Sequence, residues 1–406
     1  MTLRRRRRSP PSRPWRIVFL VHLVEAWDGI ADVIAAMRAA PDFDPIVVSI
    51  PRRFNGENDL GFEEIVHQFL DAEDVEHARI TVDDAERADA MVEVLAPDLV
   101  LRQSQWDDDV PPALATERLG FTRTALIPYE TMNIVENVPQ PGTADTALDS
   151  PYHRCAWIVF CANDLVLEAA RRTGERRGAQ FRVVGHPKAD RLRRAAPTWP
   201  IPSPAGTDRT RIAWSAHHSI ATNWTEFGTF PTVAPDMLHW ATEEPDQDFV
   251  FLPHPALRPF TNRPESPITR RDYDAWCAAW NALPNTATSA PGRYAGVLAA
   301  ADVVITDGLS MLVETQVVGR PLVFIERDGH RPFNEIGTIV MRGAHTAADV
   351  PAARKCATAL VADGDPLAAA QKDNVRRLFG DDVSTTLIMT TLRKCLHSDP
   401  PVTPRD

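Results

Sequence analysis

The sequence is short of the residues that build disulfide frameworks and zinc centres. Its 406 residues include only five cysteines, and no two of them form a Cys-x-x-Cys pair. The odd count and the scattered spacing exclude a disulfide scaffold and favour reduced thiols in a cytoplasm. The cysteines are Cys155, Cys161, Cys277, Cys356 and Cys395.

Long apolar runs are also missing. No uninterrupted apolar stretch reaches the length of about 18 residues that a membrane-spanning helix needs. The first apolar run, Ile17–Val24, contains His22 and is followed at once by Glu25, without a small-residue cleavage site. It indicates a buried strand rather than a secretion signal. We therefore expect a cytoplasmic protein, either soluble or peripheral to the inner face of the membrane.

Positive charge is in deficit. The chain has 44 Lys and Arg against 55 Asp and Glu, a net charge of −11, which argues against a nucleic-acid-binding protein. The exception is the unbroken run Arg4–Arg8, which lies in a predicted disordered tail over residues 1–14. The alternative is a patch that rests on an anionic membrane surface, where each basic residue contributes on the order of 1 kcal/mol.

The sequence does contain a sustained alternation of short apolar runs and amphipathic stretches. This alternation predicts parallel sheets with crossover helices, and the length suits two domains. We predict an α/β protein with two doubly wound, Rossmann-like domains and a cleft between them. The predicted segments are the tail 1–14, an acceptor-side domain 15–193, a Pro-rich linker 194–210, a donor-binding domain 211–380, and a C-terminal helix and tail 381–406.

Strands and helices follow from the same pattern. The expected strands cover residues 17–24, 44–50, 79–82, 98–102, 124–128, 156–161, 181–184, 211–215, 249–252, 302–306 and 321–325. The expected helices cover residues 26–39, 62–70, 85–95, 164–172, 294–301, 311–318, 366–378 and 385–396. Asp365 is expected to cap the helix that begins at Pro366. Ligands of doubly wound sheets bind at the carboxyl ends of the strands, so residues just after a strand are the functional candidates.

The strongest candidate is the segment from Ala301 to Gly319. A β-branched strand leads into Asp307 and Gly308, and a helix begins near Ser310, which can cap it. A glycine lets the backbone approach a ligand closely, and the helix N-terminus attracts a diphosphate. Glu314, one turn further on, can accept hydrogen bonds from ribose hydroxyls. The alternative is a capped helix without a ligand.

Three stretches in order resemble the CDP-glycerol glycerophosphotransferase family, the teichoic-acid and capsule polymerases of the GT-B fold. VVGHPKADRL (Val183–Leu192) is similar to that family's Gly-Tyr-Pro-Arg-Asn-Asp junction, and FVFLPHPALRPF (Phe249–Phe260) to its strand and His-Pro pair. ADVVITDGLSMLVE followed by GRPLVFIERD resembles its Thr-Asp-Tyr-Ser-Ser loop, helix and next strand. The stretch RDGHRP (Arg327–Pro332) also resembles the UDP-sugar 2-epimerases.

The resemblance implies a donor-binding role for residues of the second domain. It implies a phosphate-binding or catalytic role for His254. Arg258, one turn further on, is either a second phosphate contact or a solvated arginine, and we predict that Arg327 also holds the diphosphate. His217 and His218 end a strand of the same domain, and we predict contact with the donor. No third ligand lies near this pair in the sequence, so we predict no metal.

The first domain departs from the family pattern. The family has a His-Gly motif there, which is implied to hold a catalytic histidine, but the matching position reads Tyr129-Glu130. We predict that Glu130 is the replacement base. Gly308-Leu309 also replaces the family's Tyr-Ser, so one hydroxyl is missing from the phosphate loop. The predicted acceptor-side residues, which follow strands of this domain, are His22, Trp27, Asp28 and Arg102.

The sequence thus predicts a transferase that needs no cofactor. It would move a polyol phosphate from a CDP-activated donor to a hydroxyl of a cell-envelope polymer or a lipid-linked acceptor. One alternative is a GT-B glycosyltransferase that uses a nucleotide sugar. Another is a non-catalytic protein that binds nucleotide sugars, which the missing His-Gly motif would favour.

Overall fold

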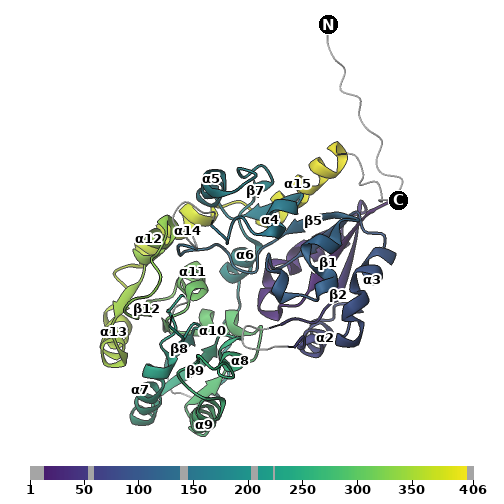
Figure 1. The fold of residues 1–406 in the computed structure, drawn as a ribbon. Helices are drawn as coiled ribbons and strands as arrows, with labels where there is room; N and C mark the ends of the chain where they lie inside the picture. Colours follow the sequence, from purple (N-terminus) through teal and green to yellow (C-terminus); the bar gives the residue numbers. More distant parts are fainter. Residues whose placement is uncertain (1–12, 54–58, 138–144, 203–208, 223–224, 400–406) are drawn as a thin grey trace.

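The computed structural model describes residues 13–53, 59–137, 145–202, 209–222 and 225–399, which form two lobes (Figure 1). The arginine run Arg4–Arg8 lies outside the described residues. Each lobe is built on one parallel sheet, with strand order β3-β2-β1-β4-β5-β6-β7 in the first and β10-β9-β8-β11-β12-β13 in the second. Both orders reverse direction beside the first strand of the lobe, as doubly wound sheets do.

The strands of the first lobe are β1 (Trp15–Val21), β2 (Phe43–Ser49), β3 (Ala78–Arg79), β4 (Leu99–Arg102), β5 (Arg123–Leu126), β6 (Ile158–Cys161) and β7 (Phe181–Val183). Those of the second are β8 (Thr210–Ala216), β9 (Gln247–Pro253), β10 (Thr286–Thr288), β11 (Val303–Thr306), β12 (Leu322–Ile325) and β13 (His345–Ala347). The central strands are buried on both faces because helices cover each sheet.

The helices of the first lobe are α1 (Ala31–Arg38), α2 (Glu63–Ala72), α3 (Ala88–Val94), α4 (Pro151–Cys155), α5 (Asp164–Thr173) and α6 (Pro187–Arg193). The second lobe begins with α7 (Phe230–Glu243), α8 (Leu257–Phe260), α9 (Arg270–Asn281), α10 (Tyr294–Ala300) and α11 (Leu309–Val318). It continues with α12 (Glu335–Met341), α13 (Val350–Asp363) and α14 (Ala368–Phe379), and α15 (Ser384–Ser398) ends the described chain. Within the described ranges, every helix is too short or too polar to cross a bilayer.

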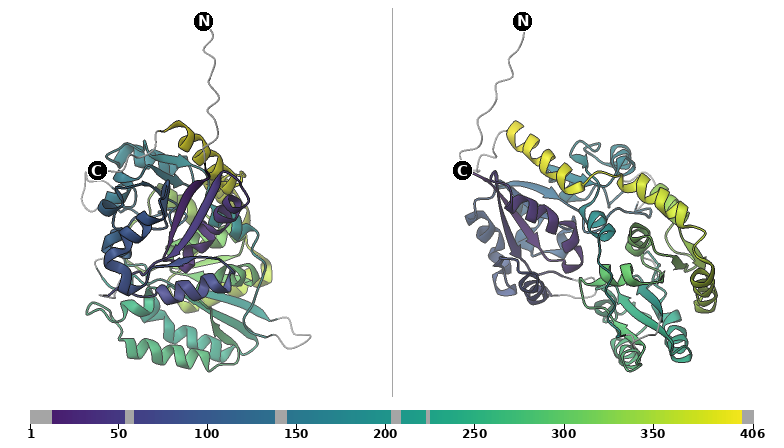
Figure 2. Two further views of the ribbon diagram at one scale, coloured as in Figure 1. Left: turned by 90° about the vertical axis from the view of Figure 1, so that its right-hand side faces the viewer. Right: turned by 180° about the vertical axis from the view of Figure 1, so that it is seen from behind.

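The last two helices lead from the second lobe back to the first (Figure 2). Apolar residues of α15, including Ile388 and Leu392, join the core on the α1 side of the first sheet. The Arg393 guanidinium donates to both Asp42 oxygens, at 2.7 and 3.0 Å. Gly185 has φ +72°, and a Cβ there would lie 2.5 Å from Ser384 Oγ, so this position requires glycine. How the chain divides into folding units stays a prediction.

Several local predictions were wrong, each for a physical reason. Residues 26–30 are not α-helical, because a 3-10 helix over Val24–Gly29 precedes α1. Helix α14 begins at Ala368 rather than Pro366, since Asp365 instead accepts from the Leu367 amide and binds His345 at 2.8 Å. Helix α7 was not predicted, because Pro235, inside the helix, interrupts the helical pattern.

Candidate functional site

Three candidate residues follow neighbouring strands of the second sheet. His217 comes directly after β8, His254 after β9 and Asp307 after β11, and these strands are adjacent in the order β9-β8-β11. The carboxyl ends of parallel strands meet at one edge of a sheet, so residues distant in sequence converge here. The structure therefore brings together His217, His218, His254 and the loop that begins at Asp307.

Asp307 connects the loops at this edge of the sheet through hydrogen bonds. Its side chain is 1% exposed and accepts hydrogen bonds from the His217 amide at 2.6 Å, the Thr229 amide at 2.5 Å and the Thr229 hydroxyl at 2.8 Å. Burial raises the pKa of Asp307 to about 6, and the hydrogen bonds from Thr229 and His217 oppose that shift. Asp307 thus positions the loop after β8 against the start of α7.

The three histidine rings form one cluster, in which His218 and His254 are stacked. Ring centroids are 4.4 Å apart for His217 and His218, 4.0 Å for His218 and His254, and 5.3 Å for His217 and His254. Burial lowers the pKa of His217 to about 4. Burial also lowers the pKa values of His218 and His254 well below the usual range, and neighbouring positive or protonatable groups add to the shift. Burial thus favours the neutral form of all three rings.

Backbone amides determine which nitrogen carries the proton in two of these rings. The Ser219 amide donates to His217 Nδ1 at 3.2 Å, and the Ala256 amide donates to His254 Nδ1 at 3.1 Å. A nitrogen that accepts from an amide carries no hydrogen, so the proton of each neutral ring lies on Nε2. Each Nε2 is then a hydrogen-bond donor, suited to an oxyanion.

The same tautomers bear on metal binding. One nitrogen from each of the three rings lies within 4.8 Å of the others, a spacing that a metal ion could share. A metal ligand must present a lone pair, and its other nitrogen normally donates to an acceptor. In His217 and His254, Nδ1 accepts from a backbone amide instead. A metal bound at Nε2 would move the ring proton to Nδ1, where the new N–H would point at the N–H of that amide. The cluster suits an anion better than a cation.

The loop after Asp307 differs in one detail from the prediction. The cap position of α11 is Gly308, and Ser310, predicted as the cap, lies inside the first turn without a capping hydrogen bond. The Gly308 amide instead donates to Thr306 Oγ1 at 2.8 Å. A Cβ on Gly308 would approach that oxygen to 3.2 Å, which explains the small residue. The N-terminus of α11 therefore carries no side-chain cap of its own.

Two predicted phosphate contacts are engaged elsewhere. Arg327 donates to the carbonyl oxygens of Ser219, Ile220 and Gly228, at 3.2 to 3.4 Å, and so braces the loop after β8. Arg258 forms a bidentate pair with Asp274, at 2.8 and 3.0 Å, on the exposed side of α8. Contact of either arginine with a phosphate stays a prediction.

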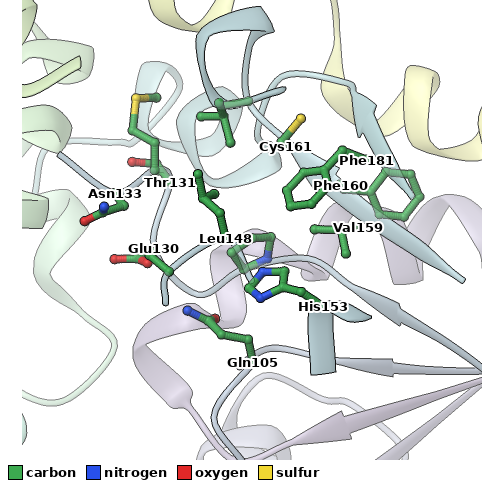
Figure 3. Close-up of a pocket in the computed structure, with 15 residues that line it drawn as sticks. Gln105, Glu130, Thr131, Asn133, Leu148, His153, Val159, Phe160, Cys161 and Phe181 are labelled. Atoms are coloured by element: carbon green, nitrogen blue, oxygen red, sulfur yellow. The ribbon is translucent and has the colours of Figure 1, made fainter. Parts of the chain in front are cut away.

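In the first lobe, Glu130 has the chemistry of a base. Burial raises its pKa to about 7, the charge of Asp145 adds to the shift, and a hydrogen bond with Gln105 opposes it. Figure 3 shows its carboxylate on the side of a small pocket away from Phe160 and Phe181. The cavity measures about 30 Å³, enough for one water molecule but not for a substrate.

Lys188 is a central residue that the sequence reasoning missed. Its ammonium lies 2.7 Å from Glu314 Oε1, with side-chain exposures of 7% and 0%, and the pair links α6 to α11. Burial dominates the pKa shifts of Glu130 and His254, and the charge of Lys188 contributes to both. A signal was present, because Lys188 matches the arginine of the family's Gly-Tyr-Pro-Arg-Asn-Asp junction. Glu314 is 0% exposed, and the ribose contact predicted for it stays a prediction.

Arg52 is the second missed residue. It is 9% exposed, pairs with Glu25 at 3.5 Å, and its charge acts on both His22 and His254. Arg52 therefore adds positive charge from the first lobe beside the histidine cluster. Nothing in its sequence context distinguishes it from a solvated arginine.

The predicted acceptor-side residues are largely built into the first lobe. His22 and Arg102 are 0% exposed, and Arg102 donates to Asp107 at 2.8 Å. Trp27, at 5%, lies in the core, and Asp28 pairs with Arg191 of α6 at 2.8 Å. Not every polar atom here is satisfied, since Arg102 Nε lies buried without a hydrogen-bond partner. Acceptor contact for these four residues stays a prediction.

The sequence matches no protein-family model and no curated protein. Solved structures are similar over nearly the whole chain. A UDP-N-acetylglucosamine 2-epimerase has a TM-score of 0.62 at 14% identity, covering 97% of this chain and 100% of that one. The UDP-GlcNAc 2-epimerase from Neisseria meningitidis bound to UDP-GlcNAc has a TM-score of 0.59 at 11% identity, covering 94% and 100%.

The wall teichoic acid polymerase TagF is also similar, with a TM-score of 0.56 at 13% identity, covering 95% of this chain and 90% of that one. Identities this low establish the fold alone. The chain has the GT-B fold, two parallel-sheet α/β domains, which confirms the predicted fold class. The likeness does not single out the CDP-glycerol family, because epimerases and TagF are similar to comparable degrees.

Proposed function

We propose that this protein is an enzyme whose substrate is linked to a nucleoside diphosphate, with a UDP-type nucleotide sugar as the preferred donor. The observation that carries the proposal is the pair of imidazoles His217 and His254, whose Nδ1 atoms accept from backbone amides, at the strand-end edge where Asp307 leads into the uncapped start of α11. Two fixed N–H donors and a helix N-terminus suit a diphosphate. Similar folds were solved with UDP and with UDP-GlcNAc, which supports this substrate class.

Glycosyl transfer uses these groups as follows. The bond between the anomeric carbon and the diphosphate oxygen breaks, and its electron pair leaves with the diphosphate. His217, His254 and the α11 terminus stabilise the charge that develops on that oxygen. The acceptor hydroxyl adds to the anomeric carbon, and Glu130, as the proposed general base, takes its proton.

A second candidate is transfer of a polyol phosphate from a CDP-linked donor. It is favoured by the three ordered stretches quoted above and by the similarity to TagF, solved with CDPG. Here the acceptor attacks phosphorus, the bond between the two phosphates breaks, and CMP leaves. The candidates thus release different products, a nucleoside diphosphate in the first and a nucleoside monophosphate in the second. A lipid-linked acceptor and membrane contact of Arg4–Arg8 belong to the same proposal.

A thermal-shift screen tests the proposal. UDP-, CDP- and GDP-linked compounds should raise the melting temperature by mass action, whereas the free nucleosides should not. The donor that binds is then incubated with envelope-derived acceptors, and the released nucleotide is identified. Release of UDP supports the first candidate and release of CMP the second. If no nucleoside diphosphate compound shifts the melting temperature at millimolar concentration, the proposal is wrong.

The pH dependence of the reaction tests Glu130. A base with a pKa of about 7 loses its function as it is protonated, so kcat/KM should fall below an apparent pKa near 7. Glu130→Gln should remove this limb and lower kcat about 100-fold or more. Because folding raises this pKa above 4.5, the carboxyl stabilises the fold below pH 4.5 and loses that contribution as pH rises through 7. An unchanged rate and profile in the variant would exclude Glu130.

A further inference from the structure

A second group of histidines lies on the first lobe, apart from the strand ends described above. His67 and Asp71 are one turn apart on α2, and His77 comes just before β3. One ligand atom from each of the three side chains lies within 4.8 Å of the other two. His67 Nδ1 is 2.9 Å from His77 Nε2, and Asp71 Oδ2 is 3.4 Å from His67 Nε2.

The hydrogen bonding of His77 is the reverse of that in the strand-end cluster. His77 Nδ1 lies 2.7 Å from the carbonyl oxygen of Val75, which can only accept, so Nδ1 carries the proton. The lone pair of the neutral ring is then on Nε2, which accepts a hydrogen bond from His67 Nδ1. An ion bound between the two nitrogens would displace the proton of His67 Nδ1. The side chain is 3% exposed, which holds this orientation. A ring that donates to a carbonyl through one nitrogen and presents a lone pair at the other is the usual state of a metal-binding histidine.

We propose that His67, Asp71 and His77 form a site for a divalent transition metal ion such as Zn²⁺. Two imidazole nitrogens and one carboxylate oxygen match its ligand preference, whereas Mg²⁺ and Ca²⁺ prefer sets made only of oxygen. With metal–nitrogen distances of about 2.0–2.1 Å, ligand atoms around one ion are roughly 3 Å apart, as the two imidazole nitrogens already are. The Asp71 side chain is 61% exposed, and its second oxygen lies 4.0 Å from His77 Nδ1.

Such an ion would join the last turn of α2 to the start of β3 across the loop Glu73–Glu76. The same end of α2 contacts the second lobe, where Arg293 binds Glu73 at 2.7 Å and Gly292 lies against the Phe69 ring. The metal site would therefore stiffen the first-lobe side of an interlobe contact. It is independent of the nucleotide site and of the reaction proposed above.

Calorimetric titration of the full-length protein with Zn²⁺ tests the site, with Co²⁺ absorption as a second readout of nitrogen ligation. The unmodified chain should bind one equivalent at this site and gain thermal stability. His77→Ala and Asp71→Ala should each weaken binding at least tenfold. Asp71 is exposed, so its variant should fold even if loss of the buried His77 ring impairs folding.

The matched control is His239→Ala. His239 and Glu243 form a similar one-turn pair on α7, at 3.2 Å, but belong to neither three-residue group. This control should bind Zn²⁺ as the unmodified chain does. A double variant, His217→Ala with His254→Ala, should also still bind one equivalent of Zn²⁺. This result would show that the ion does not bind at the strand-end histidines. The proposal is overturned if Zn²⁺ shows no saturable binding to the unmodified chain. It is also overturned if binding survives in both Asp71→Ala and His77→Ala, or if only the variant without His217 and His254 loses it.

Discussion

Replacing His254 with alanine should weaken binding of UDP about 10- to 100-fold and leave binding of uridine unchanged. A hydrogen bond to a charged group contributes about 1.5–3 kcal/mol, which corresponds to this range of affinity. The Nε2–H of His254 is directed by the Ala256 amide at Nδ1 and is proposed to contact only the diphosphate. Calorimetry with UDP and uridine, or with the nucleotide that the thermal-shift screen selects, measures the difference.

His254→Gln and His239→Ala serve as controls for this result. The glutamine amide can restore an N–H donor, so part of the lost affinity should return. His239 is exposed on α7, with 71% of its side chain accessible, and its loss should leave the affinity unchanged. Equal weakening of UDP and uridine binding in His254→Ala would contradict a diphosphate contact and indicate a general disturbance of the fold.

Replacing Lys188 with methionine should lower the free energy of unfolding by about 3–5 kcal/mol, the usual effect of removing one partner from a buried ion pair. The variant leaves the Glu314 carboxylate, which is 0% exposed, without its cation. It also removes the ammonium that lies 5.4 Å from the centre of the Tyr294 ring. Denaturant unfolding measures the change.

The double variant Lys188→Met with Glu314→Gln is the informative companion, because it removes both charges. If the penalty comes from an isolated buried carboxylate, the double variant should recover most of the lost stability. Recovery of stability without recovery of nucleotide binding would place at least one of Lys188 and Glu314 in the substrate site as well. If the double variant is no more stable than Lys188→Met, then the ion pair is not the source of the loss.

Much of the fold could be predicted because its signals are local. Short β-branched runs such as Val303–Thr306 are expected as strands on composition alone, and the structure places strands there. Errors arose where a local sequence signal is overridden by contacts with distant parts of the chain. Pro235 lies inside α7 although proline normally breaks a helix, and Asp365 binds His345, a partner outside its own helix, instead of capping α14. Neither outcome can be deduced from a window of neighbouring residues.

The candidate site also has a part that the sequence predicts and a part that only the fold determines. The strand-end positions of His217, His254 and Asp307 follow from the alternation of strand and loop, which made each of them a candidate on sequence alone. Their proton positions depend on amides in the folded loops, and the third histidine near His217 and His218 is supplied by the neighbouring strand.

By itself, then, the sequence determined two doubly wound domains and the loop between Asp307 and α11, because strand and helix periodicity are properties of adjacent residues. Only the tertiary structure decided which side chains are neighbours. It paired Lys188 with Glu314, set His254 beside His218 and brought His77 to His67. The physical reason is that burial and hydrogen-bond partners, which govern charge and tautomer, come from segments that meet only after folding.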